Sequence, residues 1–519
     1  MQLGKPRKLK GLWRIIFSRF FVIGLIILLQ LAIIISLYIW LGELIPFLSV
    51  FEVVFSFIMV FFIFNGEMDN ASKLTWLLII AVLPIPGSLF LLFTRKNGLN
   101  RALADNVARM VDKTRDTIKQ DPEVVAELQA SHGTDPSGTL AVDRYILRTN
   151  DFPVYKDTEV TFFPLGEYKY KAMLEELQKA EKFIFMEYFI IEEGEMWGSI
   201  LDILVAKARE GVDVRVMFDG LCEISTLPDN YVSLLRNVGI KAHAFSPLTP
   251  LLSTHYNYRD HRKILVIDGN VAFNGGVNLA DEYINRKERF GHWKDTAVML
   301  KGRAVQTFTL MFLQMWNIYE EEKDFSQALI QAEPVKAQGY VMPYGDCPLD
   351  GHKVGESVYT DILYRANRYV HIMTPYLILD GELETALKYA AERGVDVRLI
   401  LPGIPDKKAA YSLAKAHYKS LVASGVKIYE YTPGFVHAKV VVSDDERAVV
   451  GTINFDYRSL YHHFECATYM YRTACIPGID ADFLATQEKS RQVTPGTIRN
   501  EKTSYKLMGT ILKLIAPLF

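Results

Sequence analysis

The sequence predicts an α/β protein in which an N-terminal helical membrane region precedes two lobes of mixed β-sheet flanked by helices. The first observation is a duplicated pattern, because HRKILVID at 261–268 and HAKVVVSD at 437–444 space His, Lys and Asp in the same way. The second is the order of apolar runs and helical stretches, which repeats in both halves and is typical of βαβ units. The third is the excess of apolar residues before residue 94.

Three apolar runs follow a basic segment, 1–19, and occupy about 20–41, 45–64 and 74–93. Each is close to the roughly 20 residues that a helix needs to cross a bilayer. The first run is longer than the apolar part of a signal peptide, so we expect it to be retained. Glu52 in the second run and the prolines of LPIPG in the third allow either run to be re-entrant.

Basic residues on the flanks of these runs predict their orientation. The Lys and Arg residues of 1–19 place the N-terminus in the cytoplasm. Arg95, Lys96 and Arg101 follow the third run and hold the rest of the chain on the same side. Three complete crossings cannot satisfy both flanks, so we expect that one run does not cross. The prediction is a multi-pass membrane protein with its two lobes in the cytoplasm.

The remaining segments follow from composition and from the repeat. Residues 94–150 have the charged, helical pattern of a linker, interrupted by HGTDPSG. The lobes extend over 151–335 and 336–500, and their period is far longer than that of a solenoid repeat. We therefore expect a pseudo-twofold pair whose two histidines meet at the shared face. The apolar tail, 501–519, forms either a packed helix or a helix in the membrane interface.

Charge and cysteine content argue against two classes of function. The formal net charge is −2 and no long basic run crosses the lobes, which disfavours a nucleic acid partner. The four cysteines are scattered without the CxxC spacing of zinc and redox sites, so we expect buried free thiols.

The duplicated motif predicts a site for one phosphate. Residues two apart on a strand point to the same face, so His261 and Lys263 face one ligand, as do His437 and Lys439. A lysine ammonium suits an anionic oxygen, and two converging His/Lys pairs can surround a single phosphate. A metal ion is the rival ligand for paired histidines, but the adjoining cations would repel it. We therefore expect no metal and no other cofactor.

Phosphoryl transfer by two histidines needs one neutral imidazole to attack phosphorus and one imidazolium to protonate the leaving oxygen. Each imidazole also needs an acceptor that fixes its other ring nitrogen. The repeat supplies one candidate carboxylate in each half, Asp295 in WKDTAVM and Glu465 in FECATYM.

Two further repeated pairs of polar residues each have two interpretations. Asp268 and Asp444 end the motifs and are either catalytic or structural, as turn formers and buried hydrogen-bond acceptors. Asn278 and Asn454 follow the glycine-containing turns GGVN and GTIN. These amides either donate to a phosphate oxygen or cap the next segment.

The motifs carry a family resemblance that covers about residues 160 to 475. HRKILVID with GGVN, and HAKVVVSD with GTINFDYRS, resemble the paired HKD motifs of the phospholipase D superfamily. The stretches NYRDHRK, ERFGHWKDT, TPYLILDG and PGFVHAK are similar to bacterial cardiolipin synthases in particular. The chain departs from the common pattern at Asp260, and at His463 and Phe464, where many members have asparagine.

The resemblance implies that two phosphatidylglycerol molecules are converted into cardiolipin and glycerol through a covalent phosphohistidine. It assigns His261 as the nucleophile and His437 as the general acid and then base. It also implies a bacterial cell membrane as the location and membrane lipids as partners, and it is compatible with a homo-oligomer. The remaining positions map onto phosphate-binding residues, namely Lys263, Lys439, Asn278 and Asn454, and onto the orienting carboxylates, Asp295 and Glu465.

Three alternatives remain at the level of sequence. A phospholipase D hydrolase, or a phosphatidyltransferase with another alcohol as acceptor, needs the same residues. A catalytically inactive membrane scaffold belongs to a different class and would be expected to have lost some polar residues of the motifs. Both copies of the motif are intact.

Overall fold

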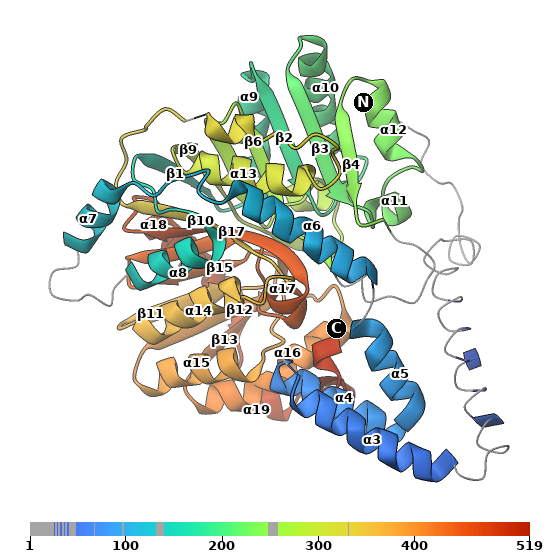
Figure 1. The fold of residues 1–519 in the computed structure, drawn as a ribbon. Helices are drawn as coiled ribbons and strands as arrows, with labels where there is room; N and C mark the ends of the chain where they lie inside the picture. The colour runs from blue at the N-terminus through green and yellow to red at the C-terminus, as the bar shows by residue number, and fades with distance from the viewer. Residues whose placement is uncertain are drawn as a thin grey trace.

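A computed structural model describes residues 48–66, 68–95, 98–130, 140–247, 258–330 and 332–518, together with isolated residues between 25 and 40. The apolar run expected at 20–41 therefore lies largely outside the described residues. Figure 1 shows two α/β lobes, one above the other, with the N-terminal helices beside the lower lobe.

The first lobe is built on a seven-stranded mixed sheet. The strands β2, β3 and β4, on one side of the sheet, run parallel to one another, and the remaining strands join antiparallel. The helix α10 (Glu195–Arg209) makes the crossover that a parallel β2–β3 pair requires. In spatial order the strands are β1 (Thr158–Phe163), β9 (Ala297–Gly302), β7 (Val271–Gly275), β6 (Lys263–Ile267), β2 (Phe183–Tyr188), β3 (Asp213–Asp219) and β4 (Lys241–Phe245).

The second lobe repeats this order strand by strand, which confirms the duplication. Seven of its strands have the same sequence of parallel and antiparallel neighbours as the first sheet. An eighth strand, β18 (Ser490–Gln492), is added at the edge. The shared strands are β10 (Tyr340–Asp346), β17 (His463–Tyr471), β16 (Arg447–Gly451), β15 (Val440–Ser443), β11 (Tyr369–Met373), β12 (Asp396–Pro402) and β13 (Lys427–Tyr431).

Three short strands connect the lobes or lie between them, and helices cover the sheets. The strand β5 (Arg259–Asp260) pairs with β17, and β8 (His292–Lys294) pairs with β14 (Gly434–Val436). The helices of the first lobe are α9 (Gly166–Gln178), α10, α11 (Cys222–Ser225), α12 (Tyr231–Asn237), η2 (Asp281–Ile284), α13 (Val305–Trp316) and η3 (Ser326–Leu329). Those of the second are α14 (Val354–Arg365), α15 (Gly381–Glu392), α16 (Lys408–Ala423), α17 (Tyr457–Tyr461), α18 (Ile476–Glu488) and α19 (Pro495–Arg499).

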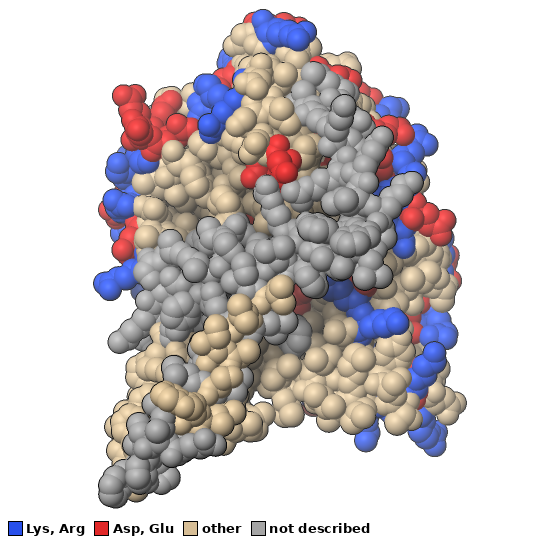
Figure 2. Space-filling view, turned by 90° about the vertical axis from the view of Figure 1, so that its right-hand side faces the viewer, with Lys and Arg blue, Asp and Glu red and all other residues tan. Residues whose placement is uncertain are grey.

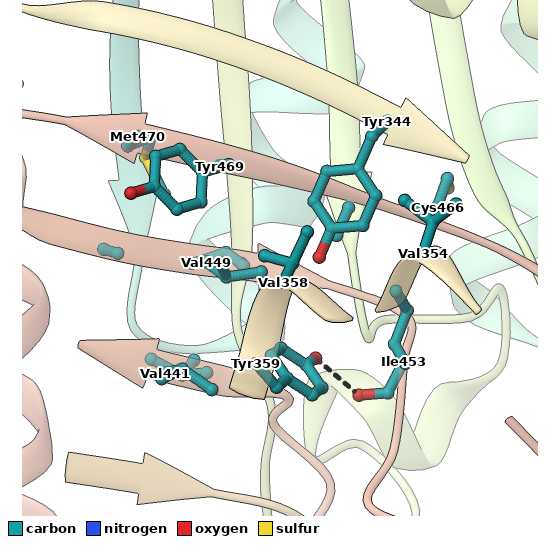
Figure 3. Packing of buried hydrophobic residues seen from close by; sticks show 14 of the residues in the cluster. Tyr344, Val354, Val358, Tyr359, Val441, Val449, Ile453, Cys466, Tyr469 and Met470 are labelled. Atoms are coloured by element: carbon teal, nitrogen blue, oxygen red, sulfur yellow. Dashed lines mark hydrogen bonds between the residues drawn. The ribbon is translucent and has the colours of Figure 1, made fainter. Parts of the chain in front are cut away.

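One hydrophobic core runs through both lobes. The apolar helix α13 packs against the first sheet, where the rings of Phe312 and Phe185 stack with centroids 4.7 Å apart, and it also contacts β10 of the second lobe. In the second lobe, α14 presses Val358 toward Val449 and Tyr469 of the sheet (Figure 3). Because strands of both sheets contribute to this core, the lobes are held in one fixed relation.

The range 94–150, for which we expect a linker, forms α6 (Gly98–Thr114), α7 (Pro122–Ala130) and α8 (Leu140–Asn150). Leu103 and Val107 of α6 are buried in the common core, and α6 lies against α13. Gln314 Nε2 on α13 donates to Thr114 Oγ1 at 2.8 Å. These helices therefore belong to the body of the lobes and are not a free spacer.

The N-terminal helices differ from the expected spans. The run at 74–93 is divided into α4 (Asn70–Val82) and α5 (Pro84–Arg95), because Pro84 and Pro86 lack the N–H groups that would continue α4. The run at 45–64 appears as α3 (Leu48–Phe64). Across the part of the chain that the structure describes, no helix combines the length and apolar character that a membrane crossing requires.

The tail forms a packed helix, α20 (Thr503–Lys513), followed by η4 (Ala516–Leu518). A Cβ atom on Gly509 would overlap the backbone oxygen of Ser412, so the missing side chain allows α20 to approach α16 closely. Thr75 Oγ1 donates to the carbonyl of Leu514 at 2.8 Å, which joins the tail to α4. The tail therefore connects the N-terminal helices to the second lobe.

Candidate active site

The two motif histidines lie where the lobes exchange backbone hydrogen bonds. The N–H of His261 donates to the carbonyl of Phe464 at 2.9 Å, and the N–H of His437 donates to the carbonyl of Lys294 at 2.7 Å. Each bond continues one of the short strand pairs between the lobes, β5 with β17 and β14 with β8. Each motif is therefore fixed by the opposite lobe.

The imidazoles are oriented by carboxylates that also come from the opposite lobe. His261 Nδ1 lies 2.9 Å from both carboxylate oxygens of Glu465, and His437 Nδ1 lies 2.6 Å from Asp295 Oδ2. Both carboxylates are fully buried. With each Nδ1–H donating to a carboxylate, Nε2 of each ring is left for chemistry. The sequence supplied both carboxylates but not this crossed pairing.

The carboxylates are kept in their anionic form. Burial alone would raise the pKa of Glu465, but its contacts with His261 and His463 hold that pKa below its usual range. Thr452 Oγ1 also donates to Glu465. Burial likewise opposes the charge on Asp295, yet contacts with His437 and Lys439 lower its pKa.

The two motif lysines are buried beside the histidines. The ammonium groups of Lys263 and Lys439 donate to the carbonyls of His261 and His437. Burial lowers the pKa of Lys263 to about 8 and that of Lys439 to about 7, and the charge of Lys263 contributes to the lowering at Lys439. An anion bound between them would relieve this repulsion. The lysines therefore favour a negatively charged ligand.

Burial disfavours the charged form of both imidazoles in the free site. Burial lowers the pKa of His437 to about 4, with Lys439 adding to the effect, and holds the pKa of His261 well below its usual range. The charge of Lys263 also lowers the pKa of His437, so the two motifs form one electrostatic unit. An anionic phosphate would raise the pKa of both rings and allow one of them to carry a proton.

Asp268 and Asp444 lie at the far end of the motif strands from the histidines. Asp268 accepts hydrogen bonds from three successive backbone N–H groups, residues 181–183, at 2.7 to 2.8 Å. Asp444 accepts from residues 367–369 at 2.7 to 2.9 Å. Both residues have positive φ, 53° and 58°. They tie β6 to β2 and β15 to β11, so of the two interpretations the structure favours the structural one.

The two asparagines differ in their surroundings. Asn278 Oδ1 accepts from the N–H of Ile190 at 3.0 Å, and its Nδ2 donates to the hydroxyl of Tyr283 at 2.8 Å. Asn454 Oδ1 is buried and has no hydrogen-bond partner among the described residues. Asn278 therefore has the contacts of a structural residue, whereas Asn454 retains a free acceptor.

The sequence did not identify a pair of residues that support these asparagine turns. Lys169 Nζ donates to the carbonyl of Val277 at 3.2 Å, and the hydroxyl of Tyr359 donates to the carbonyl of Ile453 at 2.9 Å (Figure 3). Burial lowers the pKa of Lys169 to about 7, and Asp295 opposes that lowering. Nothing in the sequence distinguishes Lys169 from the other lysine of its helix.

A third histidine, His463, reaches the same site. It lies with its ring centroid 5.3 Å from that of His261. The ligand atoms of His261, His463 and Glu465 lie within 4.8 Å of one another, close enough to hold a metal ion. The nearby charge of Lys263 already lowers the pKa of His261 and would oppose a second cation at this point.

Comparison with known proteins gives a consistent result. The family model described as "Cardiolipin synthase, PLD-like domain" matches residues 173–316 and 359–486, and each match contains one motif. A cardiolipin synthase of Alkalihalophilus pseudofirmus is 32% identical over 473 residues, which cover 90% of this chain and 93% of that protein. An uncharacterised protein of Streptococcus mutans is 56% identical, covering 88% of this chain and 99% of its own length.

Solved structures show a similar fold. The crystal structure of a phosphatidylserine synthase from Haemophilus influenzae aligns with a TM-score of 0.54 at 14% sequence identity. The alignment covers 73% of this chain and all of the other. At this identity the likeness concerns the fold alone.

Proposed function

Because this chain belongs to the cardiolipin synthase family with phospholipase D-like domains, we propose that it joins two phosphatidylglycerol molecules into cardiolipin and releases glycerol. The chain is a phosphatidyltransferase, and the observation that carries the proposed reaction is the buried pair of histidines with crossed carboxylates. Such a pair provides one nucleophile and one proton carrier around a single phosphate.

In the first half of the reaction, Nε2 of His261 attacks the phosphorus of one phosphatidylglycerol. The bond from phosphorus to the glycerol oxygen breaks, and His437 gives its proton to that oxygen. His437 carries this proton because the anionic lipid raises its pKa from the low value of the free site. The product is a phosphatidyl group linked to His261, while free glycerol leaves.

In the second half, the neutral His437 takes a proton from a glycerol hydroxyl of the second phosphatidylglycerol. The resulting oxygen attacks phosphorus, and the bond between phosphorus and His261 breaks. One phosphodiester replaces another, so the overall free energy changes little and no nucleotide is consumed. The burial of both histidines limits the access of water, which would otherwise produce hydrolysis.

The proposed location is the surface of a bacterial membrane, with the lobes on the cytoplasmic side. Phe57 and Phe61 of α3 are about three-quarters exposed, and the neighbouring face in Figure 2 is largely uncharged. Leu507, Ile511 and Leu514 form an exposed apolar stripe on α20, which adjoins α4. Exposed apolar faces of this kind bind to the interface of a bilayer, because the apolar side chains are then removed from water.

A basic groove beside α20 supports attraction to anionic lipid. It has a volume of about 1130 Å³ and lies between α16, α19 and α20. The cations that line it without a carboxylate partner in the described part of the chain are Lys419, Arg499, Lys502 and Lys506. Each basic side chain near an anionic surface contributes about 1 kcal/mol of binding free energy.

The product of the purified protein tests the reaction. When the purified protein is incubated with vesicles of phosphatidylglycerol alone, we expect cardiolipin and glycerol in equal amounts without added nucleotide, because both substrates are the same lipid. Chromatography of the lipids and an enzymatic assay of glycerol give the two quantities. Phosphatidic acid as the main product would identify a hydrolase instead, and a different phosphatidyl ester formed only when another alcohol is added would identify another acceptor.

The position of α20 gives a second expected result. An environment-sensitive fluorophore attached to Cys in place of Ile511 should shift its emission to shorter wavelength when anionic vesicles are added, because the apolar stripe enters the bilayer interface. The same label at Tyr168, an exposed residue of α9, is the control. The double variant Lys502→Glu with Lys506→Glu should bind the vesicles more weakly. The lipid concentration that gives half of the emission shift at Ile511 should therefore rise roughly 25-fold. An unchanged emission at Ile511 contradicts the proposed orientation.

A further inference from the structure

Beside each motif histidine lies a second ring whose N–H has no hydrogen-bond partner among the residues that the structure describes. His463 precedes Glu465 by two residues, and Trp293 precedes Asp295 by two. Residues two apart on a strand point to the same face, so each ring accompanies the carboxylate that orients a motif histidine. The pseudo-twofold relation of the lobes therefore places a polar ring next to each of the two histidines.

His463 is the clearer member of this pair. Its side chain is 92% buried, and its ring lies 5.3 Å from the ring of His261 and 6.3 Å from that of Phe189. Nδ1 stands 3.8 Å from Glu465 Oε1, beyond hydrogen-bond distance. Neither ring nitrogen has a hydrogen-bond partner among the described residues. Such a group in the interior is destabilising unless a ligand satisfies it.

Trp293 has the same position relative to His437. The two rings lie with centroids 5.4 Å apart, and Trp293 is 95% buried. Its Nε1 also lacks a hydrogen-bond partner in the described part of the chain. An unpaired donor therefore recurs on both sides of the site, on two strands that are far apart in sequence.

The neighbouring carboxylates already have other hydrogen-bond donors. Both oxygens of Glu465 are already occupied by His261, and one of them also accepts from Thr452. Asp295 accepts from His437 and from the N–H of Thr296. A phosphate oxygen bound in the site would give these N–H groups an acceptor.

We propose that His463 donates a hydrogen bond to a non-bridging oxygen of the phosphoryl group held between His261 and His437, and that Trp293 Nε1 is its counterpart on the other side. This inference rests on the proposed function, which brings a phosphodiester between the two histidines. His463 then belongs to the phosphate-binding residues with Lys263 and Lys439. Its ring N–H would add a directional donor beside the two buried ammonium groups.

Variants of His463 that keep or remove the donor test the proposal. His463→Phe retains a ring and His463→Leu retains bulk, and both remove the donor, whereas His463→Asn and His463→Gln keep an amide N–H near one of the two ring nitrogens. The apolar variants are expected to lower kcat for cardiolipin formation by about 10- to 100-fold, the usual effect of a lost hydrogen bond to a charged group. At least one amide variant should return to within about threefold of the wild type. His352→Phe, at an exposed histidine, is the control.

Binding of orthovanadate, an analogue of the five-coordinate phosphoryl group, separates this inference from the proposed function. Calorimetric titration should show a similar 10- to 100-fold weakening in the apolar variants, and Trp293→Phe should weaken binding as well. If the wild type binds vanadate but forms no cardiolipin, the proposed reaction fails and the vanadate series still decides the role of His463. Folded apolar variants, judged by unchanged Tm, that keep full vanadate affinity would overturn the proposal. So would a loss of activity that neither amide restores.

Discussion

His261→Ala is expected to abolish cardiolipin formation, by a factor on the order of 10⁴ or more, and to leave no lipid attached to the protein. The reason is that the variant lacks the nitrogen that forms the bond to phosphorus. His437→Ala should also lose cardiolipin formation, because glycerol then leaves without a proton. With a phosphatidyl donor that carries p-nitrophenol, however, the leaving group needs no proton, and His437→Ala should still form the covalent adduct.

Mass spectrometry of the trapped protein measures the adduct, and release of p-nitrophenol measures its rate of formation. Lys336→Glu, at an exposed residue where the second lobe begins, controls for general effects of substitution. An adduct that maps to His437 would exchange the roles of the two histidines. The crossed carboxylates and the shared phosphate site would remain.

Glu465→Gln and Asp295→Asn are expected to lower cardiolipin formation by on the order of 10²- to 10⁴-fold each, because a carboxamide cannot stabilise the charge or hold the tautomer of its imidazole. The structure predicts that the two defects differ in kind. Glu465 contacts His261, so Glu465→Gln should slow the attack on phosphorus for every leaving group. Asp295 contacts His437, so Asp295→Asn should regain most of its rate of adduct formation with the donor that carries p-nitrophenol.

The dependence of the rate on the leaving group is the decisive measurement. Neighbourhood in sequence would suggest the opposite pairing, since Glu465 lies in the half that carries His437 and Asp295 lies in the half that carries His261. Rescue of Glu465→Gln together with failure to rescue Asp295→Asn would contradict the assignment. Asp268→Asn is the matched control, because its carboxylate binds three backbone N–H groups away from the histidines. It should lower the Tm and leave the leaving-group dependence unchanged.

Much of this protein follows from its sequence because the information is local or repeated. Short stretches of chain contain the duplicated motif, the alternation of strands with helices and the segments that resemble a known family. These stretches predicted two α/β lobes with matching strand order, and they identified both histidine–lysine pairs. Periodicity and spacing act over a few residues, so they can be seen without knowing how distant segments meet.

The N-terminal region shows where local patterns are insufficient. The apolar run at 74–93 is long enough for one membrane span, yet the prolines after Leu83 end one helix and begin another. The charged helices of 94–150 have the composition of a spacer, but Leu103 and Val107 are buried against the lobes. The break at the prolines has a local cause that composition over 20 residues does not reveal, whereas the burial of Leu103 and Val107 depends on the surface against which the helix packs.

The sequence by itself predicted the candidate site residues of this protein, namely two histidines, two lysines and two carboxylates. Only the tertiary structure decided how they are paired. The bond from His261 to Glu465 joins residues 204 positions apart, and that from His437 to Asp295 joins residues 142 positions apart. The tertiary structure also decided that His463 and Trp293 stand beside these rings, with N–H groups that have no hydrogen-bond partner in the described part of the chain. Contacts of this range arise when two sheets pack around one core, because packing brings together strand ends that no sequence spacing relates.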